Sequence, residues 1–142
     1  MASLDTNVLV RYLVQDDDRQ FALAKKLVQA ALRAGETLYV PITVMLELEW
    51  VLRSNFGFDK DQISSAMSSL LASVELTFES EAAAEVALAL YQRNKADFAD
   101  CVHVALAHAA GEGPLWTFDR AASKLDGANM LASLNITSVP FE

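Results

Sequence analysis

The chain has 142 residues, of which 53% are hydrophobic, and it carries a formal net charge of −8 at pH 7. This length predicts a single domain over residues 1–142, and this hydrophobic content excludes a disordered chain. The acidic balance argues against a broad electrostatic nucleic-acid binder, whose surface would be basic. It does not argue against an enzyme that reaches phosphate groups through bound metal ions.

The chain has neither the cysteines of a disulfide or zinc scaffold nor the apolar runs of a membrane protein. Cys101 is the single cysteine, which excludes an intrachain disulfide and a thiolate-rich zinc site. No apolar run reaches the roughly 18–20 residues of a membrane span, and no basic segment followed by an apolar one marks a signal peptide. We therefore expect a soluble, cytoplasmic protein that does not contact membranes.

Short apolar strands alternate with helical patterns, which is typical of βαβ units and a parallel sheet. In the first half we expect a strand at 2–5, a helix capped by Thr6 or Asn7 and ending near Gln15, a helix from 16–18 to Gly35, a strand at 38–40 and helices at 42–55 and 59–71. In the second half we expect a strand at 74–77, helices at 80–94 and 98–110, a strand at 115–118, a short helix at 120–125 and a strand at 136–139. These elements predict an α/β fold with a central, mostly parallel sheet of about five strands.

Several acidic residues stand where such a fold exposes a site. Asp5 ends the first apolar strand, and Asp119 follows the apolar strand at 115–118. Ligands of open α/β sheets bind beyond the carboxyl ends of the strands. The helix that starts with Asp97 and Asp100 leads back toward the start of the strand at 115–118, so its first turn belongs to the same edge. We therefore expect three distant segments to converge on one rim.

Each acid also has a structural explanation. Asp97 and Asp100 are spaced as in a capping box, which accounts for Asp97 at least as well as a ligand role does. Asp119 could cap the short helix that follows it, and the acids at 16–18 are expected to cap the second helix rather than to catalyse. Asp5 has little structural work available at the end of a first strand. It is therefore the strongest candidate.

Glu47 and Glu49 lie two positions apart on a predicted helix, which separates their side chains by about 200°. Both cannot face one site, and helical geometry does not choose between them. Carboxylates in apolar runs are costly unless something pairs with them, and we find no lysine or arginine embedded in these runs as a partner. This pattern predicts a divalent cation.

The remaining candidates are weaker. His103 lies three residues after Asp100, but we expect His103 and His108 to be packed or surface residues. Trp50 and Phe56 are expected in the core rather than in a base-stacking surface. No HExxH motif, Walker loop or glycine-rich dinucleotide turn is present, so zinc proteolysis and nucleotide-binding folds have no support.

A cluster of carboxylates suits Mg²⁺ or Mn²⁺, which are hard ions held by oxygen ligands and water with room for substrate phosphate. Without metal, the clustered acids would repel one another and raise each other's pKa. One or two bound ions would keep the acids ionised, activate a water molecule and stabilise the leaving oxygen. The acids therefore favour phosphodiester hydrolysis over zinc chemistry.

Four short motifs together resemble the PIN-domain nucleases, and among these the chain is most similar to the VapC-type toxins of bacterial toxin–antitoxin pairs. The motifs are Leu-Asp-Thr-Asn-Val-Leu-Val at 4–10, Glu-Leu-Glu-Trp-Val-Leu-Arg at 47–53, Asp-Phe-Ala-Asp at 97–100 and Thr-Phe-Asp at 117–119. Each motif is short, but their order and spacing are fairly specific. The resemblance covers essentially the whole chain.

The resemblance implies a three-layer α/β/α domain that carries a Mg²⁺- or Mn²⁺-dependent endoribonuclease. The four catalytic and metal-binding acids would be Asp5, Glu47, Asp100 and Asp119, so the resemblance selects Glu47 over Glu49. Asp97 would be a further, less certain metal ligand. Asn7 and Thr117 match polar positions that support such a site through hydrogen bonds to acids or water.

The resemblance also implies an RNA substrate, a homodimer and a small antitoxin whose tail enters the active-site groove, with DNA contacted only through the antitoxin. Lys95 and Arg120 flank the acids and could steer the RNA backbone. Other classes explain less. A phosphatase of the haloacid dehalogenase type needs an acid where Asn7 stands, and a receiver domain needs an acid pair on the first strand. A non-catalytic, metal-stabilised module that binds an antitoxin-like regulator remains the alternative.

Overall fold

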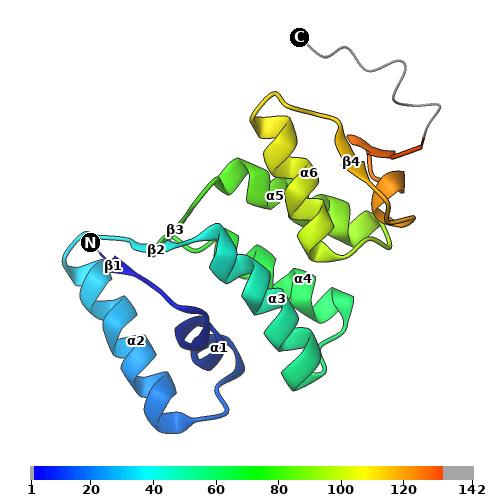
Figure 1. Cartoon of the computed structure of the whole chain (residues 1–142). Helices are drawn as coiled ribbons and strands as arrows, with labels where there is room; N and C mark the ends of the chain where they lie inside the picture. The colour runs from blue at the N-terminus through cyan, green and yellow to red at the C-terminus, as the bar shows by residue number, and fades with distance from the viewer. Residues whose placement is uncertain (1, 133–142) are drawn as a thin grey trace. The chain divides into compact units, whose positions relative to one another are not determined.

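The computed structural model describes residues 2–132 of the chain, and its elements follow one another as strands and helices in the order shown in Figure 1. The chain divides into two compact units, Met1–Ala84 (unit 1) and Glu85–Glu142 (unit 2), which are described separately. The expected alternation of strands and helices is confirmed. No helix within residues 2–132 has both the length and the apolar character needed to cross a membrane.

Unit 1 is built on a parallel sheet of three strands in the order β1, β2, β3. The strands are β1 (Ala2–Ser3), β2 (Leu38–Val40) and β3 (Leu76–Phe78). Leu38 of β2 pairs with Ala2 on one side and with Leu76 on the other. Because the strands are parallel, their carboxyl ends meet at one edge, where the chain turns into α1 and α3.

Four helices complete this unit, namely α1 (Thr6–Val14), α2 (Asp18–Arg33), α3 (Ile42–Phe56) and α4 (Lys60–Leu71). The helix α1 packs against both α2 and α3, and α3 packs against α4. Asp59 and Gln62 form a capping box at the start of α4. Gly57, with φ of +66°, ends α3 in the left-handed conformation that favours glycine.

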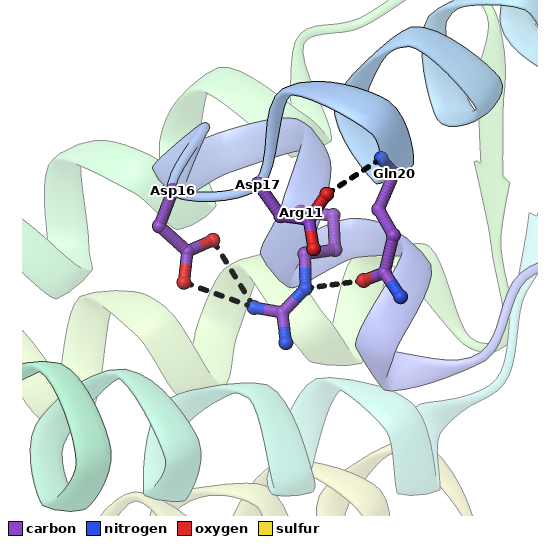
Figure 2. Close-up of polar contacts among 4 residues, drawn as sticks. All are labelled: Arg11, Asp16, Asp17 and Gln20. Atoms are coloured by element: carbon purple, nitrogen blue, oxygen red, sulfur yellow. Dashed lines mark hydrogen bonds and ion pairs between the residues drawn. The ribbon is translucent and has the colours of Figure 1, made fainter.

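The joint between α1 and α2 explains the run of acids at 16–18. Figure 2 shows the Arg11 guanidinium of α1 between Asp16, whose two carboxylate oxygens lie 3.1 and 3.2 Å from Nη1, and the side-chain oxygen of Gln20. Asp17 caps α2 by accepting a hydrogen bond from the Gln20 N–H at 2.9 Å. The expected capping role is confirmed for Asp17, whereas Asp16 pairs with Arg11.

The core of unit 1 consists of large aliphatic side chains from its sheet and helices. The most deeply buried of these are Leu9, Val40, Met45, Leu48, Leu52, Ile63 and Met67. The expectation that Trp50 belongs to the core is wrong, because its side chain is 56% exposed. Trp50 lies two residues, or about 200°, from the buried Leu48, so it points away from the face of α3 that packs inward.

Unit 2 contains most of α5 (Glu81–Arg93), together with α6 (Phe98–Ala109), β4 (Leu115–Thr117), the 3₁₀ helix η1 (Ala122–Lys124) and β5 (Ala128–Met130). The strands β4 and β5 form a parallel pair in which Leu115 faces Ala128. The Tyr91 and Phe98 rings join α5 to α6 edge to face, with their centroids 5.3 Å apart. Thus α6, which carries the candidate acid Asp100 and follows Asp97, is anchored by a packed aromatic pair.

The α/β class and the parallel pairing of the strands are confirmed, but the strands are divided differently from the expectation. The described residues contain a sheet of three strands and a separate sheet of two, rather than one sheet of five. The strand β5 at Ala128–Met130 is not predicted from the sequence, because it contains no β-branched or aromatic residue. The strand expected at 136–139 lies outside the described residues.

Candidate active site

Asp5 lies just beyond β1 and is the N-cap residue of α1, so the expectation that Thr6 or Asn7 caps this helix is wrong. Its Oδ1 accepts a hydrogen bond from the Thr6 N–H at 2.7 Å. Capping side chains usually bond the second or third N–H of a helix, whereas Asp5 bonds the first. Among the described residues, Asp5 Oδ2 has no hydrogen-bond donor. The acid is therefore fixed by one oxygen and available through the other.

Glu47 lies in the second turn of α3 and is exposed. Its Oε1 accepts a hydrogen bond from the Thr6 hydroxyl at 3.3 Å. Thr6 itself is only 4% exposed. Unit 1 therefore connects Asp5 and Glu47, which are far apart in the sequence, through one buried threonine between them.

Glu49 has a different environment from Glu47. It is only 6% exposed, and its carboxylate accepts hydrogen bonds from Arg53 Nε at 2.9 Å and Nη2 at 3.4 Å. The expectation that no basic residue within these apolar runs pairs with an acid is therefore wrong for Glu49. Arg53 lies four positions further along α3, a spacing at which opposite charges meet on one helix face.

The acids of unit 2 lie at the start of α6 and after β4. Asp97 occupies the N-cap position of α6, but its side chain accepts no capping hydrogen bond. The capping box suggested by the Asp97–Asp100 spacing therefore does not form. Without that bond, the carboxylate of Asp97 is not committed to the helix.

Asp100 lies in the first turn of α6 and is half-buried. Burial raises its pKa above the ordinary value, and the negative charges of Asp119 and then Asp97 raise it further, whereas His103 opposes them. Within unit 2, the carboxylates of Asp97 and Asp119 therefore both act on Asp100. Like charges held in this way are relieved either by a proton or by a cation.

The side chain of Thr117 accepts a hydrogen bond from the backbone of Asp119. The Asp119 N–H donates to Thr117 Oγ1 at 3.0 Å, and Asp119 Oδ2 accepts from the Ala122 N–H at 2.8 Å. The N-cap residue of η1 is Ala121, so the expectation that Asp119 caps this helix is wrong, although Asp119 Oδ2 accepts from the first N–H of η1. This contact uses one carboxylate oxygen of Asp119, so it does not conflict with a role in binding metal.

The other predicted residues lie outside these contacts. Asn7 is exposed on α1 and lines a shallow groove with Val8 and apolar side chains of α2; within residues 2–132 it makes no hydrogen bond to the acids. Lys95 and Arg120 are exposed. In the described part of the chain, neither forms an ion pair with the candidate acids.

The structure thus brings the candidate acids together in two sets, one within each unit. In unit 1, Thr6 links Asp5 to Glu47, and in unit 2, Asp97, Asp100 and Asp119 interact electrostatically. Within the described ranges, no three His, Cys, Asp or Glu side chains are grouped so as to hold a metal ion by themselves. The donor chemistry nevertheless fits Mg²⁺ or Mn²⁺, because every donor is a hard carboxylate oxygen.

Thr6 is the residue whose role sequence reasoning missed. Its position directly after Asp5 suggested a helix cap, and this local signal hid the hydroxyl contact with Glu47. The two residues are 41 positions apart, so only the packing of α1 against α3 reveals the contact.

Comparisons with known proteins find a relative of the chain and the family to which it belongs. A VapC ribonuclease of Aquifex aeolicus (strain VF5) is 25% identical to the chain over 125 residues, which cover 88% of the chain and 92% of that relative. The model of the PIN domain family matches residues 2–128, a range that includes every candidate acid. The chain therefore belongs to the PIN domain family.

Proposed function

We propose that this protein is a Mg²⁺- or Mn²⁺-dependent endoribonuclease and the toxin of a toxin–antitoxin pair. The observation that carries the proposal is the half-buried acid Asp100 with the negative charges of Asp119 and Asp97 beside it, in a PIN-domain chain that is similar to a VapC ribonuclease. Repulsion between such charges lowers the stability of the folded protein unless a proton or a cation neutralises part of the charge. A hard divalent cation is the counter-charge that suits carboxylate donors best.

In this proposal Asp5, Glu47, Asp100 and Asp119 act in one active site of a single domain, and Asp97 is a further ligand. Bound Mg²⁺ or Mn²⁺, as one ion or two, would supply an activated water molecule and stabilise the leaving oxygen of the phosphodiester. The chain's own residues would bind the metal ions and orient one another. Asp5 is held through Oδ1, and Thr117 holds the backbone of Asp119. Asn7, exposed at the start of α1, would support the site by a hydrogen bond to water.

The substrate in this proposal is RNA, whose phosphates would be steered by the exposed Lys95 and Arg120. The regulator is a small antitoxin whose tail enters the active-site groove, and DNA is contacted only through that antitoxin. The net charge of −8 suits a partner with basic residues at this site. We further propose that the protein is a cytoplasmic homodimer.

The alternative function is a non-catalytic module in which the same acids bind metal only to stabilise a surface for a regulator. Family membership favours a nuclease over a phosphatase of the haloacid dehalogenase type. Purified protein without its partner separates the two remaining possibilities, because only the enzyme hydrolyses RNA.

The experiment is the incubation of a total RNA pool with the partner-free protein in Mg²⁺, in Mn²⁺ or in EDTA. The wild type is compared with Asp5→Asn and with Asp61→Asn, which changes an exposed acid in the first turn of α4. We expect discrete cuts that need metal, persist in Asp61→Asn and disappear in Asp5→Asn. Metal binding without any cutting would favour the binding module. Cutting by Asp5→Asn would mean that the site is misplaced.

A further inference from the structure

We infer that Thr6 is a positioning residue that holds Asp5 and Glu47 in the arrangement needed to bind a divalent cation. This inference rests on the proposed function, because it takes these two acids as metal ligands. Thr6 acts through its neighbours and is not expected to touch substrate or metal. Its two polar groups each contact one acid.

The two contacts are the starting point. The Thr6 N–H donates to Asp5 Oδ1 at 2.7 Å, and the Thr6 hydroxyl donates to Glu47 Oε1 at 3.3 Å. A carboxylate can only accept, so the hydroxyl proton must point toward Glu47. One residue therefore joins the end of β1 to the second turn of α3.

Burial makes this link more rigid than an exposed contact would be. Thr6 is only 4% exposed at the start of α1, and its branched side chain has few allowed rotamers. Asp5 and Glu47, by contrast, are both exposed. Two exposed carboxylates are therefore held by one buried residue, Asp5 through the Thr6 backbone N–H and Glu47 through the Thr6 hydroxyl.

The link also determines which oxygens remain available. Thr6 occupies Asp5 Oδ1 and Glu47 Oε1, while Oδ2 and Oε2 have no hydrogen-bond donor among the described residues. Mg²⁺ demands nearly octahedral geometry from its ligands, so the orientation of each available oxygen matters. Residues that orient metal ligands in this way typically change metal affinity or activity by about 10- to 100-fold when they are replaced.

The test compares Thr6→Val, Thr6→Ser and a control, Thr77→Val. Valine keeps the shape of the side chain and the backbone contact with Asp5 but removes the hydroxyl, whereas serine keeps the hydroxyl. Thr77 is an exposed threonine of β3, so its replacement controls for the chemical change alone. If Thr6→Val does not fold, Thr6→Ala removes the same hydroxyl without adding bulk.

The primary measurement is Mn²⁺ binding by calorimetry without RNA, accompanied by the unfolding midpoint and by RNA cleavage. We expect Thr6→Val to bind Mn²⁺ about 10- to 100-fold more weakly, with Thr6→Ser close to wild type. We expect Thr77→Val to bind like the wild type. A merely structural Thr6 would change the unfolding midpoint of Thr6→Val but not its affinity for Mn²⁺.

The outcomes separate this inference from the proposed function. Wild-type affinity in Thr6→Val, or failure of Thr6→Ser to restore binding, overturns the role of Thr6 even if the wild type cleaves RNA. If the wild type binds Mn²⁺ but cuts no RNA, the nuclease proposal fails while the binding data still judge Thr6. A wild type that binds no Mn²⁺ overturns both.

Discussion

Glu47 and Glu49 lie two residues apart on α3, and we predict that their replacement has opposite consequences. Glu49→Gln should lower the free energy of unfolding and leave RNA cleavage unchanged. Glu47→Gln should abolish cleavage and leave the stability unchanged. The reason is their environment, because Glu49 is buried and paired with Arg53, whereas Glu47 is exposed and, among the described residues, accepts a hydrogen bond only from Thr6.

The magnitude follows from the Glu49–Arg53 contact. A hydrogen bond to a charged group contributes about 1.5–3 kcal/mol, and one between neutral groups contributes about 0.5–1.5 kcal/mol. Because Arg53 stays charged, glutamine keeps a hydrogen bond to a charged group and loses only the ion pair and one accepting oxygen, which costs about 0.5–1 kcal/mol. Because the Arg53 side chain is 53% exposed, water partly screens the charge, and this keeps the loss near the low end. Glu47→Gln should stay within about 0.5 kcal/mol of wild type, as is usual for an exposed side chain.

The assays are denaturant unfolding of the metal-free protein and RNA cleavage in Mg²⁺, both on wild type, Glu47→Gln and Glu49→Gln. Arg53→Met serves as a partner control, because it removes the same ion pair from the other side. Loss of cleavage in Glu49→Gln without any loss of stability would refute the reasoning. An equal loss of stability in Glu47→Gln would refute it as well.

Three further predictions concern the charge cluster and the backbone. Asp100 has a raised pKa in the folded protein, so its ionisation disfavours folding. The stability of the metal-free wild type should therefore fall as the pH rises from about 3.8 through the folded-state pKa. Asp100→Asn should lack this fall when unfolding is measured between about pH 3 and 8. Mn²⁺ at about 100 times its Kd should stabilise the wild type by about 2.7 kcal/mol, an increase that EDTA reverses in thermal unfolding. Gly127→Ala should lower the free energy of unfolding by about 1–3 kcal/mol, because Gly127 has φ of +97° and a Cβ there would lie 3.1 Å from Val104 Cγ1. Urea denaturation checks this last effect, and an unchanged midpoint would contradict it.

Helices were predictable from the sequence because their signals are local. The helix expected at 98–110 is observed at Phe98–Ala109, and its apolar face and first-turn acid are both readable from the sequence. Trp50 could also have been placed correctly from the spacing of its buried neighbours. The helical period places it on the outer face, away from the buried Leu48.

Strand pairing was less predictable, since it depends on distant partners. Ala128–Met130 has weak strand propensity and forms β5 by pairing with β4. Its pairing therefore overrides the local signal. By contrast, Leu38–Val40 has a clear strand pattern, and its expected bounds are those observed.

The candidate site shows the same division between local and distant information. The acidic motifs were readable, and the Glu49–Arg53 pair could have been read from its spacing of four residues. The Thr6–Glu47 contact could not, because it depends on how α1 packs against α3. Likewise, the effect of Asp119 on Asp100 depends on how β4 lies against α6.

The proposed function requires Asp5 and Asp100 to serve the same metal site. The most direct test measures Mn²⁺ binding by electron paramagnetic resonance. It compares the wild type, Asp5→Asn, Asp100→Asn and the double variant. Ligands of one site act as a unit. We therefore predict that the double variant loses much less affinity for Mn²⁺ than the sum of the losses in the two single variants. Fully additive losses, or loss of one ion in each single variant and of two in the double, would contradict a shared site.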